Sequence, residues 1–163
     1  MNKMLVVYFS FSNGNTKKIA TLLAEAKKAN LEEIKPITPY LGTYDEVVTQ
    51  GQKEVNEGFK PPIKKININD YQVIAIGTPT WWFTMAPAVK TFIEENDFTD
   101  KTVIPFMTNG GWPGHVIKDM TNSLKGATVI NPMEIRFDSN GGDKLITDSK
   151  LIEKWIDSID IKE

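Results

Sequence analysis

Seven consecutive residues near the amino terminus carry hydrogen-bond donors in a pattern typical of anion binding. They follow an apolar run, residues 4–9, and precede an amphipathic segment that begins near Lys17. Five of the seven are Ser, Asn or Thr, whereas an ordinary helix cap needs only one such residue. Because backbone N–H groups at a helix start also favour negative charge, the segment predicts a phosphate site. The candidate residues of this loop are Ser10, Phe11, Ser12, Asn13, Gly14, Asn15 and Thr16.

The composition of this loop indicates a phosphate that is held rather than transferred. It lacks the Gly-Lys-Ser/Thr ending of a P-loop, so no lysine is placed for a transferring phosphate. It also lacks the three-glycine fingerprint of dinucleotide binding. The alternative interpretation is a plain N-cap without a ligand.

Two later segments, each after an expected buried strand, combine aromatic residues with residues that permit close backbone approach. In the first, Trp81 and Trp82 are adjacent, and neighbours in extended backbone point to opposite sides, so at most one is expected in the core. In the second, Gly110 and Gly111 allow a ligand close to the backbone, and Trp112 adds a flat ring. The alternative is that these tryptophans are core or rim residues. The candidate ligand residues here are Pro79, Thr80, Trp81, Trp82, Phe83, Thr84, Thr108, Asn109, Gly110, Gly111, Trp112 and Gly114.

Short apolar runs alternate with helical periods along the chain. Strands are expected at residues 4–9, 31–34, 71–76, 102–107 and from 127, resuming at 133–137, and helices after residue 17, around 45–56, from about 85, around 117–124 and around 152–159. The alternation predicts a single α/β domain over residues 1–163: a three-layer α/β/α sandwich with a doubly wound, five-stranded parallel sheet. Such sheets bind ligands at the carboxyl ends of their strands, which is where all three candidate loops lie.

The composition excludes several classes of site. With 163 residues and a net charge of −2, the chain gives no sign of nucleic acid or an anionic membrane as a partner. It has no cysteine, which excludes disulfides, thiolate catalysis and Cys-ligated metals, and one histidine cannot build a zinc site alone. That residue, His115, is expected to be exposed with no special role, whereas Trp155 is expected in the core. Without a segment long enough for a signal-peptide core or a membrane span, the expected location is the cytoplasm.

The three loops, taken in order, resemble the flavodoxin family over nearly the whole chain. Residues 8–20 resemble its phosphate loop and first helix, residues 78–82 its first isoalloxazine loop, and residues 108–114 its second. The resemblance implies a flavodoxin-like strand order of 2-1-3-4-5, with FMN bound where that order reverses. It also implies that Trp81 stacks on the flavin and that Trp112 lies near the second aromatic wall. The peptide between Trp82 and Phe83 would face flavin N5, and Phe83 stands where related sequences often carry glycine, so a positive φ there is more costly.

The function that this resemblance implies is a low-potential electron carrier with tightly bound FMN. We expect a monomer that docks transiently with redox partner proteins, a reductase donor and an acceptor enzyme. The alternative is an FMN-dependent NAD(P)H:quinone oxidoreductase on the same fold, and the lack of a basic residue in the three loops favours the carrier. A phosphorylated receiver module would need aspartates at the strand ends, where this sequence has Ser10 and Thr78.

Overall fold

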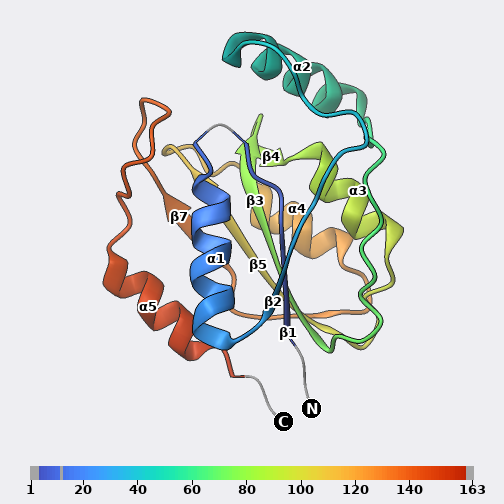
Figure 1. Cartoon of the computed structure of the whole chain (residues 1–163), viewed down its shortest axis with the longest axis vertical. Coiled ribbons are helices and arrows are strands. Elements are labelled where there is room, and N and C mark those ends of the chain that lie inside the picture. Colours follow the sequence, from blue (N-terminus) through green and yellow to red (C-terminus); the bar gives the residue numbers. More distant parts are fainter. Residues whose placement is uncertain (1–3, 12, 161–163) are drawn as a thin grey trace.

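Strands and helices alternate along the chain in the expected order (Figure 1). The computed structural model describes residues 4–11 and 13–160, so the candidate phosphate residue Ser12 lies outside the described residues. The strands are β1 (Met4–Tyr8), β2 (Asn30–Glu33), β3 (Val73–Trp81), β4 (Thr84–Met85), β5 (Thr102–Asn109), β6 (Thr128–Val129) and β7 (Met133–Arg136). The helices are α1 (Asn15–Lys27), α2 (Tyr44–Glu57), α3 (Pro87–Glu95), α4 (Val116–Ser123) and α5 (Ser149–Ser158).

The sheet has the predicted parallel topology. Its order is β2-β1-β3-β5-β6, and β7 pairs with β5 farther along the same edge. Strands β6 and β7 together therefore fill the fifth position, interrupted at residues 130–132, as the resumption of the apolar pattern at Met133 indicated. The predicted order 2-1-3-4-5 is confirmed, and the chain reverses direction across the sheet between β1 and β3.

Helices cover both faces of the sheet, which explains why its central strands are continuously apolar. Helices α1 and α5 pack on one face, against Val6 and Phe106, and α3 and α4 pack on the other, against Leu5 and Val7 (Figure 1). All five residues of β1 are buried, as expected for a parallel strand with both faces covered. Trp155 packs in the α1–α5 layer, which confirms the expectation for that residue.

Helix α2 departs from this layering. It lies at the edge where the strands end, at the top of Figure 1, and its outer turns are largely exposed. The side chain of Thr43 caps its start by accepting a hydrogen bond of 3.2 Å from the backbone N–H of Glu46. Because α2 sits beyond the carboxyl ends of β1 and β3, it can form a wall of any site there.

The segment 78–84 is not the open loop that the sequence predicted. Strand β3 continues to Trp81, and the chain turns back at once into β4, with Trp81 paired to Thr84. The two turn residues, Trp82 and Phe83, have φ values of 49° and 69°, so the connection has the left-handed conformation of a two-residue hairpin. Each left-handed non-glycine residue costs roughly 1–2 kcal/mol. The sequence did not predict this hairpin, because two-residue turns of this kind normally carry Asn or Gly. Since β4 occupies Thr84 and Met85, α3 begins at Pro87 rather than near Met85.

Among the described residues, no helix is long and apolar enough to cross a membrane.

Candidate functional site

A cleft of about 290 Å³ lies at the carboxyl ends of the central strands, at the reversal point of the sheet. All three candidate loops contribute to it, so residues far apart in the sequence meet at one place. The predicted residues that line it are Phe11, Asn13, Asn15, Thr16, Pro79, Thr80, Trp81, Trp82, Thr108, Asn109 and Gly110. Seven lining residues were not predicted, namely Tyr44, Val47 and Val48 of α2, and Phe137, Asp138, Gly141 and Gly142 after β7.

One end of the cleft is formed by the start of α1. Gly14 enters the helix with φ 74°, and the hydroxyl oxygen of Ser10 accepts a hydrogen bond of 3.2 Å from the backbone N–H of Lys17. The hydroxyls of Thr16 and Thr108 lie 2.8 Å apart and tie this loop to β5. Since the first N–H groups of a helix have no partner within it, those at the start of α1 can receive an anion.

A fourth loop, residues 138–144, closes over this end of the cleft. The side-chain amide of Asn15 donates a hydrogen bond of 3.0 Å to the carbonyl oxygen of Gly142, and that of Asn13 donates to Gly141. The sequence did hold a signal, because Asp-Ser-Asn-Gly-Gly is a turn-forming run directly after the last parallel strand. That position is also a carboxyl end of the sheet, but without an aromatic residue it did not stand out.

The carboxylate of Asp138 organises this fourth loop. It accepts hydrogen bonds from the backbone N–H groups of Gly142, Lys144 and Asn140 at 2.9, 3.0 and 3.1 Å. Hydrogen bonds from Lys144 and Gly142 favour the charged carboxylate and lower the pKa of Asp138 below its ordinary value. The negative charge of Asp138 is thereby bound by backbone N–H groups of its own loop.

The end of the cleft at the start of α1 also contains a side-chain acceptor without a partner among the described residues. The side-chain oxygen of Asn15 is buried and has no hydrogen-bond partner among the described residues, while its amide nitrogen is engaged by Gly142. A buried acceptor without a partner is costly, so it requires a donor from a bound molecule or a water. A ligand with hydroxyl groups would supply that donor.

The two adjacent tryptophans occupy different environments, as the alternation of side chains predicted. Trp81 points inward, with its ring edge-to-face to Tyr40, Phe9 and Phe11 at centroid distances of 5.0, 5.5 and 6.0 Å. Trp82 is 38% exposed, and its indole N–H donates a hydrogen bond of 3.0 Å to the carbonyl oxygen of Val48 in α2. Trp81 thus joins the core to the cleft, whereas Trp82 stands at its rim.

Tyr40 stands behind Trp81 and links it to a buried carboxylate. Its hydroxyl donates a hydrogen bond of 2.6 Å to the buried carboxylate of Glu54, which also accepts from Gln50 at 2.8 Å. Burial, together with the hydrogen bond to Glu54 and its charge, raises the pKa of Tyr40 well above its ordinary value. This network fixes α2 against Trp81.

A slot of about 310 Å³ extends the cleft between the hairpin and the loop of residues 108–114. Its walls are Thr80, Trp82, Phe83, Asn109, Gly110 and Trp112, and four of these also line the cleft. Trp112 is 62% exposed and Phe83 53% exposed. Exposed aromatic side chains on both sides of a slot suit the binding of a planar ligand ring between them.

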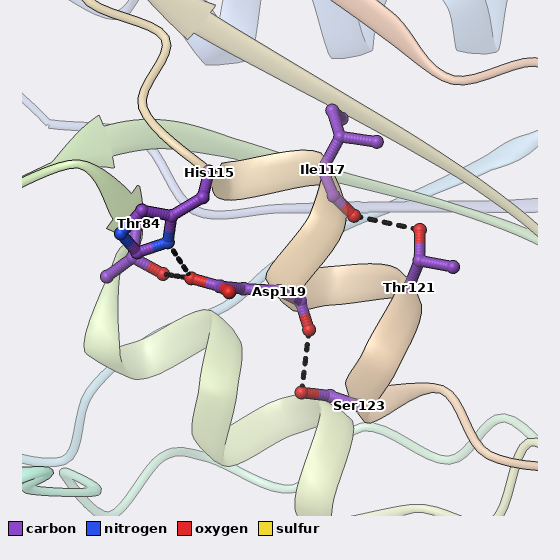
Figure 2. Close-up of polar contacts among 6 residues, drawn as sticks. All are labelled: Thr84, His115, Ile117, Asp119, Thr121 and Ser123. Carbon is purple, nitrogen blue, oxygen red and sulfur yellow. Dashed lines mark hydrogen bonds and ion pairs between the residues drawn. The ribbon is translucent and has the colours of Figure 1, made fainter.

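The remaining predicted residues shape the slot from outside. The side-chain oxygen of Asn109 accepts a hydrogen bond of 2.6 Å from Gly111 N–H, and the guanidinium of Arg136 packs on Gly111. A methyl group added at Gly114 would lie 2.3 Å from the carbonyl oxygen of Phe83. Thr84 donates a hydrogen bond to Asp119 behind the hairpin (Figure 2).

His115 makes two contacts that the sequence did not predict. It is exposed, as expected, but its ring pairs with the carboxylate of Asp119, and its backbone N–H donates to Phe83 at 2.8 Å. Figure 2 shows the ring directed at the Asp119 carboxylate that Thr84 also reaches. The pair with Asp119 follows from the i,i+4 spacing at the start of α4, whereas the bond to Phe83 requires the hairpin to lie against that helix.

These features together describe a site for a planar ring joined to an anionic group. The N–H groups at the start of α1 and the neutral side-chain donors can bind the anionic group, and the aromatic side chains can contact the planar ring. Among the described residues, no group of three or more His, Asp or Glu side chains could hold a metal ion.

Comparisons with known proteins agree with this description. Residues 3–159 match the family model described as Flavodoxin. A candidate flavoprotein from Bacteroides eggerthii is 31% identical, with a TM-score of 0.77 and 99% of this chain and 100% of that chain covered. A flavoprotein from Lactobacillus acidophilus in complex with FMN is 24% identical, with a TM-score of 0.72 and coverage of 95% and 99%. The WrbA-like flavodoxin from Agrobacterium tumefaciens shares the fold at 16% identity, with a TM-score of 0.64 and coverage of 96% and 91%. No curated protein matches the chain.

Proposed function

Because the chain belongs to the flavodoxin family, we propose that it is an electron-transfer protein that carries FMN at the carboxyl edge of its sheet. The cofactor is FMN, which is also the ligand of the similar Lactobacillus acidophilus flavoprotein. FMN supplies the redox chemistry when bound, and the protein contributes binding, orientation and electrostatics.

The residues of the site fit this cofactor at each of its parts. The start of α1, with Asn13, Asn15 and Thr16 around it, suits the phosphate group. The buried, unpartnered oxygen of Asn15 suits a hydroxyl donor, which the ribityl chain carries and a bare phosphate dianion lacks. The slot between the hairpin and Trp112 suits the isoalloxazine ring.

The tryptophans that the sequence predicted to contact the flavin ring occupy different positions in the site. Trp82 and Trp112 line the slot, and Trp81 lines the cleft beside it while packing on the inner aromatic cluster. In this proposal Trp82 and Trp112 contact the ring, and Trp81 supports its inner edge. The role of Trp81 as the stacking residue remains the prediction of the family resemblance.

The observation that carries the electron-carrier role is the exposure of the slot. Trp82, Phe83 and Trp112 all reach solvent, so a ring held between them would present an edge to another protein. The six residues that line the slot include no carboxylate, imidazole, thiol or amine. We propose a monomer that meets its redox partners in transient contacts of the kind typical of electron transfer.

One observation favours an NAD(P)H-dependent oxidoreductase as the second candidate. The three loops contain no basic residue, but the guanidinium of Arg136 in β7 lies against Gly111, which stands in the sequence between the slot residues Gly110 and Trp112. A guanidinium is well suited to bind the phosphates of a nicotinamide nucleotide.

Anaerobic mixing of the FMN-loaded protein with NADPH alone distinguishes the two candidates. The carrier keeps its oxidised flavin spectrum under NADPH and is reduced only when a reductase or dithionite is added. Rapid bleaching by NADPH would overturn the carrier proposal, and its loss in Arg136→Ala would assign the nucleotide contact. A purified protein that is colourless and gives no spectral change with added FMN would refute both candidates.

A further inference from the structure

The hairpin that walls the slot is conformationally strained. Trp82 and Phe83 are both left-handed, although neither is glycine or asparagine. Such conformations persist only when surrounding contacts determine them, and they gather at binding and switching sites. The contacts that hold this hairpin are therefore part of the site, even where they lie behind it.

The start of α4 supplies the contacts on the side away from the slot. The backbone N–H of His115 donates a hydrogen bond of 2.8 Å to the carbonyl oxygen of Phe83. The hydroxyl of Thr84, the first residue after the turn, donates a hydrogen bond of 2.5 Å to Oδ2 of Asp119. The same Oδ2 pairs with Nδ1 of His115, so one carboxylate oxygen joins the hairpin to the residue that also holds it through the backbone (Figure 2).

We propose that Asp119 is a positioning residue of the FMN site, which holds the Trp82–Phe83 turn in its left-handed conformation through Thr84 and His115. This inference rests on the proposed FMN site, because only a ring in the slot would register the position of the turn.

The position of Asp119 supports this role over that of an ordinary helix residue. It lies in the first turn of α4, where the helix dipole favours a carboxylate. The charge of Asp119 is therefore stabilised without the hydrogen bond from Thr84 in β4. Its side chain is 33% exposed and nevertheless accepts from two partners on one oxygen. The other charged groups that line the cavity behind the hairpin are Lys90 of α3 and Glu54 of α2. Glu54 is engaged by Tyr40 and Gln50, so Asp119 is the acceptor aimed at the hairpin.

The structure provides a matched control on the same helix. The hydroxyl of Thr121 donates a hydrogen bond of 2.8 Å to the carbonyl oxygen of Ile117, and Figure 2 shows this contact pointing along α4, away from Thr84. Thr121→Val and Thr84→Val remove the same group and preserve the same shape. They differ in whether the lost hydrogen bond reaches the hairpin, and Thr121 is exposed on a helix whereas Thr84 is half-buried in a strand.

The first measurement uses the protein without flavin and follows amide hydrogen exchange of His115, whose N–H donates to Phe83. Thr84→Val should speed this exchange about fivefold, which corresponds to the loss of roughly one hydrogen bond. Thr84→Ser should restore the wild-type rate, and Thr121→Val should leave it unchanged. Asp119→Asn, which keeps an acceptor for Thr84 but removes the charge facing His115, should give an intermediate rate and serves if Thr84→Val does not fold.

The second measurement uses the FMN-loaded protein and compares dissociation constants and midpoint potentials. Thr84→Val should raise the FMN dissociation constant about fivefold. Thr84→Val should also shift a midpoint potential of the bound flavin, because a displaced turn changes the binding free energies of the oxidised and reduced flavin by different amounts. Thr121→Val should change neither the dissociation constant nor the potential. Equal effects of the two valine variants, or normal exchange in Thr84→Val, would overturn the proposal. Altered exchange with unchanged FMN affinity and potential would also overturn it, because the contacts of Asp119 with Thr84 and His115 would then not serve the FMN site. If the wild-type chain does not bind FMN, the proposed function fails, while the exchange measurement still decides whether Asp119 holds the hairpin.

Discussion

The side-chain amide of Asn15, the first residue of α1, donates a 3.0 Å hydrogen bond to the carbonyl oxygen of Gly142, which lies 127 positions later in the chain. This bond joins the first loop of the sheet to the last one. The phosphate end of the cleft is therefore a two-loop structure rather than a single motif. Its ability to hold an anion depends on both loops being ordered.

Replacement of Asn15 should weaken FMN more than it weakens riboflavin. Asn15→Ala removes the bond to Gly142 and the buried acceptor, and each contact contributes on the order of 1 kcal/mol. We expect FMN affinity to fall about tenfold or more, with a smaller loss for riboflavin, since riboflavin has no phosphate to place. Fluorescence titration with both flavins tests this. Asn140→Ala, an exposed position on the same fourth loop, is the control that should bind FMN normally.

Acid should loosen the fourth loop before it unfolds the protein. The pKa of Asp138 is lowered from its ordinary value of 3.8 by hydrogen bonds from Lys144 and Gly142, so the charged form is favoured in the folded state. This contribution is present above the unfolded pKa and is lost as the pH falls through the folded pKa. NMR of the Gly142 amide from pH 6 to pH 2 should show a falling protection factor, which is the intrinsic exchange rate divided by the observed rate, below about pH 4. Asp138→Asn should remove that pH dependence, and a Gly142 amide that stays protected at pH 2 would contradict the prediction.

Substitution of Trp112 should weaken FMN binding with little effect on the free energy of unfolding, whereas substitution of Trp81 should destabilise the fold. Trp112 is exposed, so Trp112→Ala should leave the free energy of unfolding within about 0.5 kcal/mol while raising the FMN dissociation constant on the order of tenfold. Trp81 packs on three aromatic rings, so Trp81→Ala should destabilise the fold by roughly 3 kcal/mol.

Urea denaturation of the protein without flavin and FMN titration give the two quantities. The midpoint potential of Trp81→Ala for the second reduction step tests the stacking role that the family resemblance assigns to Trp81, and an unchanged value would refute that role. If Trp112→Ala bound FMN normally, the slot would not be the ring site.

Two glycines with similar backbone angles should respond differently to alanine. Gly114 has φ 58° and Gly58 has φ 65°, so both substitutions carry the left-handed cost of roughly 1–2 kcal/mol. Only at Gly114 would the new methyl group meet backbone, 2.3 Å from the carbonyl oxygen of Phe83, whereas no atom lies within 4 Å at Gly58. Gly114→Ala should therefore displace the hairpin and weaken FMN binding, and Gly58→Ala should cost only the backbone term. Thermal unfolding and FMN titration of both variants make the comparison, and equal effects would contradict the close approach.

The sequence alone determined the architecture of the chain, because that architecture follows from local patterns. Buried strands such as Val73–Ile76 read as continuous apolar runs, and helices such as α1 repeat apolar residues at helical spacing. Parallel strands must be linked by right-handed crossovers, so the alternation itself nearly fixes the sheet. The positions of the three candidate loops at the carboxyl ends of the strands followed from this, and so did the division between an inward and an outward tryptophan.

Only the tertiary structure decided which residues complete the site. Trp82 and Phe83 adopt a turn for which their types carry no signal, because contacts with α4 and with Val48 of α2 stabilise conformations that the residues themselves disfavour. The approach of Gly142 to Asn15, and of Asp119 to Thr84, joins segments with no shared sequence pattern. Such contacts are set by how the loops pack at one edge of the sheet, and packing between distant segments leaves no period in the sequence.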